Sequence, residues 1–498
     1  MKKFIQSVAA LSLLVGAIAC SGISNVDFEA KSVVSRQRTS IMIRDVNVTQ
    51  NEAVGVANMF IRSNAGDVML PTKGAFSNTK MIRSTETVRE DGQDLMYVFN
   101  YEGGGFVIVG STRNYYPILA YSDEGTFNLK EDMGPVDVWL DETKVNIKNS
   151  SGLSKETKAQ MKTLWARYDG TYIEHSPIDY AARRPQTRST GEDACWERIE
   201  TLQSLYGSLG WTFLPLSQVE DYFTDLGYED EYDEMCYSAG QNHSALSETV
   251  IGYKGGTLST TQVGPLLSTE WHQGSPFNNM CPNNKPAGCG AIAIAQVMKY
   301  YEYLSSMTWD GVTFGWTNIP YYPDGNSNQA RLVRLIGYRA NMTYGNNGSW
   351  TIPGNVEYAL ASFGYNADLD YYSILNARNN IYLYNQPVIM VGNSNNVPLP
   401  NPLNYIGDSH YWVCEGAKET TDPGIRFFTG NQPYGAGTFT QGLYSYSSPG
   451  TLGGAVYLSF YMNWGWGGSY DGWFASNNVN SGNGNFQYSR QNIYIEEP

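Results

Sequence analysis

The sequence predicts an α+β protein built in two parts. A run of small and apolar residues over 291–298 predicts one buried helix in the second part. Short apolar stretches separated by glycine-rich turns predict strands around that helix. Charged residues are about twice as frequent before residue 263 as after it, which places a boundary there. We therefore expect a buried helix packed against an antiparallel sheet, preceded by a smaller α+β domain.

The bulk composition narrows the classes of function. The chain has 498 residues, enough for two or more domains with a large core. Its net charge is −15 and it contains no basic stretch, which argues against nucleic acid and anionic membranes as partners. No histidine, cysteine and aspartate residues have the spacing of a metal site, so we expect neither a metal nor another cofactor.

The first twenty residues have the pattern of an export signal. Two lysines precede an apolar run over 8–19 that is too short for a comfortable transmembrane helix. The sequence Ala17-Ile18-Ala19-Cys20 also resembles a bacterial lipoprotein processing site, at which Cys20 would be lipidated; an ordinary signal peptide is the alternative. We expect a signal over 1–20 and a flexible tail over 21–44. The protein would be a cell-surface lipoprotein, or secreted or periplasmic, with membrane contact only through a lipid at Cys20.

Residues 45–150 have the pattern of a small α+β domain. Thr49-Gln50-Asn51-Glu52 has the form of a capping box, and the apolar residues that follow recur at helical spacing. The apolar stretches 96–99 and 106–109 flank three consecutive glycines, which predicts paired strands. A further short strand is expected at 118–121.

Residues 151–262 predict a mainly helical extension that ends in a linker. We expect the acidic cluster at 229–234 to be a solvated loop. The polar, glycine-containing segment 254–262 predicts a flexible connection. The second domain would then span 263–498 and contain another helix near 328–342.

The cysteines leave two interpretations open. Six occur, and five remain if Cys20 is removed or lipidated. An odd number in an exported protein suggests a free thiol. Cys195 with Cys236, and Cys281 with Cys414, are candidate disulfides, and buried free thiols are an equal alternative.

Cys289 is the candidate nucleophile. It stands where a loop rich in proline, asparagine and glycine gives way to the strong helical pattern. Unpaired N–H groups and the helix dipole at a first turn favour the thiolate, which is the reactive form of cysteine. We therefore expect the pKa of this thiol to be lowered, to roughly 3–7.5.

An activated cysteine needs a base, and the second part contains two of the chain's four histidines. His410 begins an alternating pattern typical of a strand, which would hold the imidazole rigidly, so His410 is the candidate base. His272 is expected to be structural or to face the substrate.

Three further side chains would complete the chemistry of acyl transfer. The developing oxyanion needs donors, for which the Cys289 N–H and the side-chain amide of Gln273 are candidates. Asn463 can hold the second imidazole nitrogen without adding charge, and Trp464 can shield that hydrogen bond from water. The alternative is that Trp464 and Trp466 have a packing role only, and that the neighbouring glycines leave room for their large rings.

The order Gln, Cys, His, Asn is that of papain-like cysteine peptidases, and the chain resembles the streptopain family of secreted bacterial cysteine peptidases. The likeness is carried by these stretches: Gly105–Val109, Leu119–Ser122, Trp271–Asn278, Gly288-Cys289, Ala295–Tyr301, Asn385–Val388, Asn463–Gly468 and Asp471–Phe474. Three features depart from the family pattern. Ser409 stands where glycine is frequent, Gly290 stands where a larger residue is common, and 151–262 is longer than in the best-known members.

The resemblance implies a papain-like peptidase domain over 263–498, preceded by an inhibitory propeptide over 45–150. It assigns Cys289 as nucleophile, His410 as base and Gln273 as the oxyanion glutamine. Asn463 and Trp464 would orient and shield the histidine.

The expected function is that of an exported zymogen endopeptidase that works through an acyl-enzyme. Its partners would be protein and peptide substrates and its own propeptide, which would be removed by cleavage within 254–266. The alternatives are another papain-like Cys/His enzyme, such as a peptidoglycan amidase or a transglutaminase, and a non-catalytic surface binding protein.

Overall fold

The structure is a computed structural model. It describes residues 45–64, 80–130, 133–169, 190–209, 211–221, 223, 229–241, 246–247, 249–255, 258–322, 327–393, 409–422, 425–430, 451–452, 455–477 and 490–497. The predicted signal over 1–20, with Cys20, and the predicted tail over 21–44 lie outside these residues. Within the described ranges, no helix combines the length and the apolar character needed to cross a membrane.

The first domain combines an antiparallel meander with helices. Its elements are α1 (Gln50–Asn64), β1 (Ile82–Glu90), β2 (Gln93–Tyr101), β3 (Phe106–Gly110), β4 (Ile118–Ser122) and α2 (Pro135–Asn149). The predicted capping box is confirmed: the Thr49 N–H donates to a Glu52 carboxylate oxygen (2.8 Å), and the Glu52 N–H donates to Thr49 Oγ1 (3.3 Å). The predicted strand pair is confirmed as β2 and β3.

The extension that follows contains helices, as predicted, but also strands. Its elements are α3 (Lys155–Asp169), α5 (Thr190–Tyr206), β5 (Thr212–Pro215), α7 (Glu229–Gln241) and β6 (Val250–Gly255). The prediction of a solvated loop at 229–234 was wrong, because these residues begin α7. Acidic residues in a first turn complement the helix dipole, while Tyr232 and Met235, three positions apart, are buried.

The predicted linker is also partly structured. Residues 259–263 form β7 (Ser259–Val263), which pairs with β14 (Ser409–Asp422) in a register that places Val263 opposite Ala417. Threonine and valine have high strand propensity, and residues 259–262 of β7 are exposed. The polarity of this segment therefore marks an exposed strand and not a flexible connection.

The second domain continues from β7 to the C-terminal strand. Its other elements are α8 (Cys289–Tyr301), β8 (Met307–Trp309), β9 (Val312–Phe314), α9 (Ser327–Arg339), β10 (Thr343–Tyr344), β11 (Ser349–Trp350), α10 (Pro353–Ser362), β12 (Asn366–Tyr371), α11 (Ile374–Tyr384), β13 (Val388–Asn393), β15 (Ile425–Gly430), β16 (Thr451–Leu452), β17 (Ala455–Asn463), β18 (Gly472–Ala475) and β19 (Gln491–Glu496). The helices predicted after Cys289 and near 328–342 are confirmed as α8 and α9.

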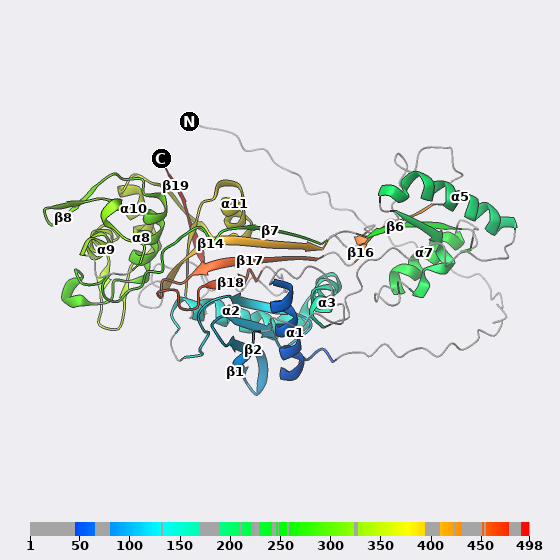
Figure 1. The fold of residues 1–498 in the computed structure, drawn as a ribbon, viewed down its shortest axis with the longest axis horizontal. Helices are drawn as coiled ribbons and strands as arrows, with labels where there is room; N and C mark the ends of the chain where they lie inside the picture. Colours follow the sequence, from blue (N-terminus) through cyan, green and yellow to red (C-terminus); the bar gives the residue numbers. More distant parts are fainter. Residues whose placement is uncertain are drawn as a thin grey trace, which may run out of the picture. The chain divides into compact units, whose positions relative to one another are not determined.

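One antiparallel sheet runs through both domains. Its strand order is β1-β2-β3-β4-β18-β17-β14-β13-β19-β12, and β7 pairs with β14 beside this path. The arrows of β14, β17 and β18 lie side by side in Figure 1. The first domain joins the second where β4 pairs with β18, with Tyr121 opposite Trp473 and Ala120 opposite Phe474.

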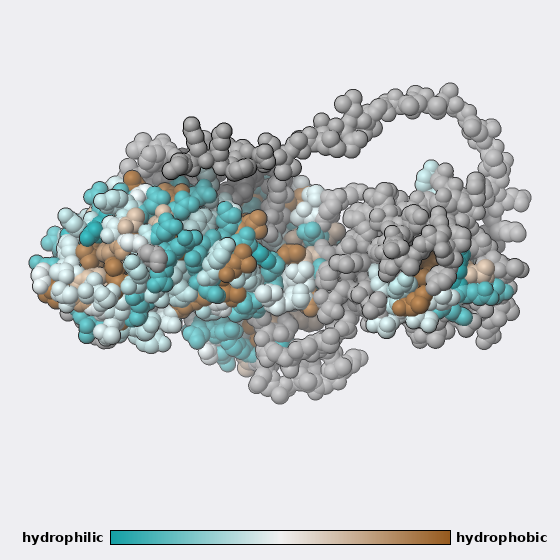
Figure 2. Space-filling model, turned by 90° about the horizontal axis from the view of Figure 1, so that it is seen from above, coloured by the Kyte–Doolittle hydropathy of each residue, from teal (hydrophilic) through white to brown (hydrophobic). Residues whose placement is uncertain are grey.

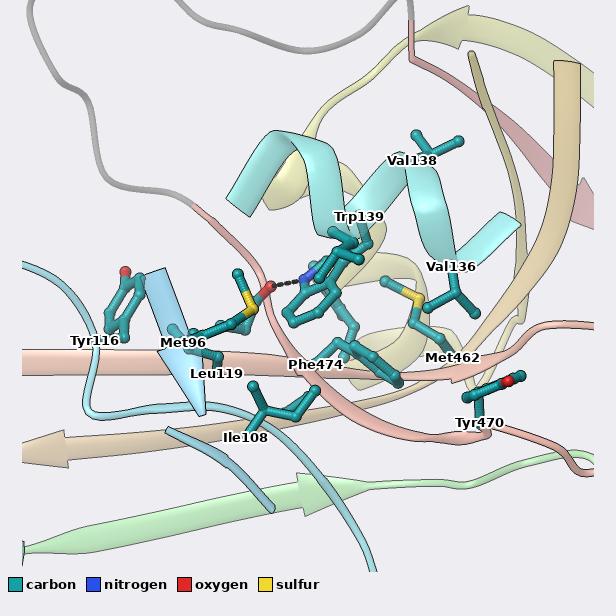
Figure 3. Packing of buried hydrophobic residues seen from close by; sticks show 14 of the residues in the cluster. Met96, Ile108, Tyr116, Leu119, Val136, Val138, Trp139, Met462, Tyr470 and Phe474 are labelled. Atoms are coloured by element: carbon teal, nitrogen blue, oxygen red, sulfur yellow. Dashed lines mark hydrogen bonds between the residues drawn. The ribbon is translucent and has the colours of Figure 1, made fainter. Parts of the chain in front are cut away.

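The cores explain why the two domains pack together. One cluster of buried residues contains Trp139 and Val136 of α2 together with Met462 and Phe474 of the second domain (Figure 3). The Trp139 indole N–H donates to the Ala475 carbonyl (3.3 Å) across this contact. A second cluster surrounds α8, whose residues from Cys289 to Lys299 are all buried. The predicted buried helix on an antiparallel sheet is therefore confirmed.

The coloured surface in Figure 2 is mostly hydrophilic. Hydrophobic residues appear on this face as separate small patches among hydrophilic ones. Scattered exposed apolar residues are normal for a folded protein. The large apolar side chains instead fill the interior, including Trp139, Trp271, Trp412 and Trp464.

Candidate active site

The backbone before α8 places Cys289 at the very start of the helix. Gly288 has a φ of 91°, a conformation that side-chain-bearing residues rarely adopt. A Cβ at this position would lie 2.8 Å from Met342 Sδ and 3.1 Å from the Ser349 carbonyl oxygen. The chain can therefore turn into the helix here only with glycine, and this turn fixes where the Cys289 thiol points.

The thiol of Cys289 lies against the strand that carries His410. Its Sγ is 3.8 Å from the Ser409 carbonyl oxygen, which can accept its proton, and it accepts the Tyr411 N–H at 3.4 Å. Ser409 and Tyr411 are the two neighbours of His410 on β14. The structure thus brings the two residues predicted as nucleophile and base, 121 positions apart in the sequence, to one place.

Both side chains belong to the lining of one cavity of about 1030 Å³. Residues of the second domain that line it include Gln273, Cys289 and His410, together with His272, Trp350 and Trp466. Gln273 thus lines the same cavity as Cys289, and its role as a donor to the oxyanion stays a prediction. The Ala287 N–H donates to its carbonyl oxygen (2.9 Å), which ties the Gln273 segment to the loop before the cysteine.

Asn463 is buried behind this cavity. Its Oδ1 accepts from Gln296 Nε2 (3.0 Å) and from the Gly465 N–H (3.2 Å), and its Nδ2 donates to the Thr269 carbonyl (2.8 Å). It is not among the described residues that line the cavity. Its assignment as the group that orients His410 stays a prediction.

Trp464 is wholly buried and packs against two aromatic rings. Its ring centroid lies 5.4 Å from that of Trp412 and 5.0 Å from that of Phe474. Trp412 is on β14, two positions after His410. Between Trp464 and Trp466, it is Trp466 that belongs to the described lining of the cavity. The sequence offered no means of telling which of the two tryptophans faces the site, because both stand next to glycines.

The charge state of the thiol differs from the sequence expectation. Burial raises the pKa of Cys289 above its usual value, and this effect exceeds the opposing influence of hydrogen bonds from nearby backbone N–H groups, including that of Tyr411. The prediction of a lowered pKa was therefore wrong for the structure in this state. The reason is that the Cys289 side chain is buried, so desolvation outweighs the dipole.

The cover includes the first domain, which reaches into the same cavity. Gly134, just before α2, and Asp137, in its first turn, belong to the cavity lining. A Cβ on Gly134 would lie 2.5 Å from the indole of Trp466. The Asp137 carboxylate accepts the Met133 N–H (2.8 Å) and so stabilises the turn that enters the cavity. Sequence reasoning missed these residues, because their partners lie in another domain.

His272 is a second histidine in the cavity lining. Its Nδ1 accepts the Gly274 N–H (3.2 Å), and burial lowers the pKa of its imidazole. Its backbone forms a β-bridge with Trp466. A neutral imidazole held in this way fits either of the roles expected for His272, structural or facing the substrate.

The structure describes four cysteines besides Cys289. Cys195, Cys236, Cys281 and Cys414 form no disulfide, so neither of the two candidate disulfides is observed. Within the described residues, no group of three or more His, Cys, Asp or Glu side chains is arranged to hold a metal ion.

Comparison with known families identifies both domains. Residues 45–147 match the Spi protease inhibitor family, and residues 271–474 match the peptidase C10 family. A cysteine endopeptidase domain behind an inhibitor domain is the arrangement of a zymogen with an inhibitory propeptide. Residues 271–474 are thus similar to peptidase C10, the streptopain family, in a fold of mixed helix and sheet. These matches favour the peptidase over a peptidoglycan amidase, a transglutaminase or a non-catalytic binding protein.

Individual relatives are distant. Streptopain of Streptococcus pyogenes is 23% identical over 422 residues, which cover 80% of this chain and 80% of the relative. The thiol protease/hemagglutinin PrtT of Porphyromonas gingivalis is 24% identical over 268 residues, covering 45% of this chain and 25% of the relative. A solved structure of a prointerpain A fragment from Prevotella intermedia covers 82% of this chain and 97% of that fragment, with 15% identity and a TM-score of 0.40.

Proposed function

We propose that the chain is an exported zymogen that hydrolyses peptide bonds through Cys289 and His410. The observation that carries the proposal is the position of the Cys289 sulfur, in contact with Ser409 and Tyr411 on either side of His410. Gln273 is also among the residues that line the cavity of Cys289 and His410. A nucleophile, a base and an oxyanion donor are the parts that acyl transfer requires.

The reaction then proceeds in two halves. The His410 imidazole takes the thiol proton, and the Cys289 sulfur attacks the peptide carbonyl carbon. The oxyanion accepts hydrogen bonds from the Cys289 N–H and the Gln273 amide. The imidazolium then protonates the leaving amine as the C–N bond breaks, and water, deprotonated by His410, hydrolyses the thioester to release the acid and regenerate the thiol. Asn463 and Trp464 orient and shield the imidazole in this scheme.

The first domain keeps the enzyme inactive until it is removed. Two observations support this role: Gly134 and Asp137 occupy part of the cavity lining, and burial raises the pKa of Cys289 while they are in place. We propose that cleavage within 254–266 separates the propeptide part from the peptidase. Removing the cover lets water and the neighbouring imidazole stabilise the thiolate.

The central test compares two cysteine variants. Cys289→Ala is expected to leave the fold intact and to abolish hydrolysis of casein by the matured protein. Cys281→Ala is the matched control, because Cys281 is also a buried free thiol but is not among the described residues lining the cavity. Cys281→Ala should retain activity, and casein hydrolysis by Cys289→Ala would overturn the proposal.

Thiol reactivity tests the zymogen state separately. Iodoacetamide at pH 7 should alkylate Cys289 slowly in the full chain and rapidly after maturation, as followed by mass spectrometry of the Cys289 peptide. N-terminal sequencing of the matured protein locates the cleavage. A mature peptidase chain, the one that contains Cys289, beginning before residue 200 would contradict cleavage within 254–266.

Export and lipidation require their own experiment. We propose export from the signal pattern over 1–20, with a lipid at Cys20 as one route of surface attachment. Metabolic labelling with an alkyne fatty acid should mark the wild-type protein and not Cys20→Ala. Secretion of unlabelled wild-type protein would support an ordinary signal peptide.

A further inference from the structure

We propose that Gln296 is a positioning residue, which fixes the Gln273 segment and Asn463 relative to the nucleophile helix. This inference rests on the proposed function, because it assigns Gln296 a task in the reaction of Cys289. The family resemblance includes Gln296 within the stretch Ala295–Tyr301 but gives it no role.

Gln296 lies on α8 about two helical turns after Cys289, so the two side chains leave the helix on the same face. The side chain is fully buried, with 0% of its surface exposed, on a helix that is otherwise apolar here. A buried amide destabilises a fold unless both its oxygen and its nitrogen find partners. The hydrogen-bond partners of the Gln296 amide therefore show which parts of the molecule it joins.

The amide oxygen holds the segment that leads to the oxyanion glutamine. Gln296 Oε1 accepts the Trp271 N–H at 3.1 Å, two positions before Gln273. The Trp271 side chain is fully buried and cannot shift easily. Two positions after Trp271, the Gln273 carbonyl oxygen accepts the Ala287 N–H. The Gln273 segment is thus held at Trp271 by the nucleophile helix and at Gln273 by the loop before Cys289.

The amide nitrogen holds the residue predicted to orient the histidine. Gln296 Nε2 donates to Asn463 Oδ1 at 3.0 Å. Asn463 in turn donates to the Thr269 carbonyl (2.8 Å), two residues before Trp271. One amide therefore links the nucleophile helix, the Gln273 segment and the Asn463 loop. A displacement of about 1 Å between such groups is enough to lower a rate about 100-fold.

The main experiment compares two glutamines. Gln296→Met keeps the length of the side chain and removes both hydrogen bonds. Gln329→Met is the matched control, because Gln329 is equally buried, on α9, and donates only to the carbonyls of Pro320 and Tyr322. Both variants should lose thermal stability. After active sites are counted with a thiol-reactive epoxide, Gln296→Met should lose roughly ten-fold or more in kcat with KM within about two-fold. Gln329→Met should keep the wild-type kcat.

A double-mutant cycle tests whether the effect passes through Gln273. Gln273→Ala should lower kcat about 100-fold or more, as for the loss of an oxyanion donor. If Gln296 acts mainly by placing Gln273, Gln296→Met in the Gln273→Ala background should lower kcat by less than about three-fold. Additive losses would overturn the proposal, as would equal kcat values for Gln296→Met and Gln329→Met. Unchanged activity of Gln273→Ala or Cys289→Ala would instead overturn the proposed function.

Gln296→Glu keeps the proposal testable if Gln296→Met does not fold. A protonated glutamic acid can still accept from Trp271 and donate to Asn463, whereas a carboxylate would face the Asn463 oxygen. The ratio of the kcat of Gln296→Glu to the kcat of wild type should be close to one at acid pH and should fall steadily as pH rises. A ratio that does not change with pH would contradict the proposed link to Asn463.

Discussion

Gly134 of the propeptide lies directly against the indole of Trp466 in the wall of the cavity that contains Cys289. A Cβ on Gly134 would lie 2.5 Å from Cζ2 of this ring, and the residue has a φ of 58°. The contact therefore exists because residue 134 has no side chain.

Gly134→Val is expected to loosen the propeptide. The clash with Trp466 and the strain of a positive φ together favour release by about 1–3 kcal/mol, which corresponds to maturation roughly five-fold faster or more. The rate of appearance of casein hydrolysis measures this. Gly92→Val is the control, since Gly92 has a φ of 78° in the same domain with nothing near its Cβ position. Equal maturation rates for the two variants would contradict the prediction.

A buried ion pair also joins the two domains. Glu142 of α2 lies 2.9 Å from Arg490, both side chains are almost completely buried, and the Arg490 guanidinium lies over the rings of Tyr372 and Trp412. Removing one partner leaves a buried charge without compensation. Glu142→Leu should therefore lower the free energy of unfolding of the full chain by about 3–5 kcal/mol, as measured by denaturant unfolding.

Two comparisons control this measurement. Lys148 lies on the same helix and pairs with Glu90 and Asp91 at the surface, so Lys148→Met should change stability little. Replacing both buried partners, as Glu142→Leu with Arg490→Met, should recover much of the loss, because no buried charge then remains. A double variant less stable than Glu142→Leu would argue against the ion pair as the source of the effect.

Local patterns predicted the elements that carry the site, and the failures have physical causes. The helix after Cys289 and the capping box at Thr49 depend on neighbours within a few residues, so the sequence alone indicated them. The acidic cluster at 229–234 looked like a solvated loop because charged residues dominate it. The buried residues of this helix, Tyr232 and Met235, stand among or directly after these charges and give only a weak apolar pattern.

The contacts between domains could not be predicted in the same way. The approach of Gly134 to Trp466 joins residues more than 300 positions apart, and a glycine gives no signal of what it touches. The raised pKa of Cys289 follows from its burial in the folded chain, which a local pattern does not indicate. A helix start predicts a reactive thiolate only where solvent or a counter-charge reaches it, and in this structure the thiol is buried.

Glu415 predicts how stability depends on pH. This carboxyl is buried on β14 and receives hydrogen bonds from the Leu267 N–H and from Asn463, but burial outweighs them and raises its pKa to about 8. Since the pKa in the folded state is raised, the stabilisation is fully present below about pH 4.5 and is lost as pH rises through about 8. The unfolding midpoint should therefore fall across this window in the wild type and less steeply in Glu415→Gln. Parallel curves for the two proteins would contradict the assignment.

The extension before the peptidase domain predicts an unusual mature form. Strand β6 pairs with β15 over six residues on each side, in the sheet order β16-β15-β6-β5, so the extension and the peptidase domain build this sheet together. The extension also has its own buried cluster, which includes Trp196 of α5, Phe213 of β5 and Ile251 of β6. Cleavage of one peptide bond after β6 breaks none of these interactions.

The segment over 190–255 should therefore stay bound to the peptidase after cleavage within 254–266, and the 45–150 domain can leave only after a second cleavage between residues 150 and 190 separates it from this segment. Matured protein should elute from a sizing column as one species and separate into two chains only under denaturing conditions, each identified by mass spectrometry. Ile251 of β6 lies opposite Thr429 of β15. Ile251→Pro should weaken this pairing and release the fragment, because proline cannot donate a hydrogen bond to the neighbouring strand. Ser259→Pro, in β7 within the cleavage region, serves as the comparison and should leave the fragment bound. A wild-type mature enzyme that lacks all peptides from 190–255 would show that the extension is discarded with the propeptide.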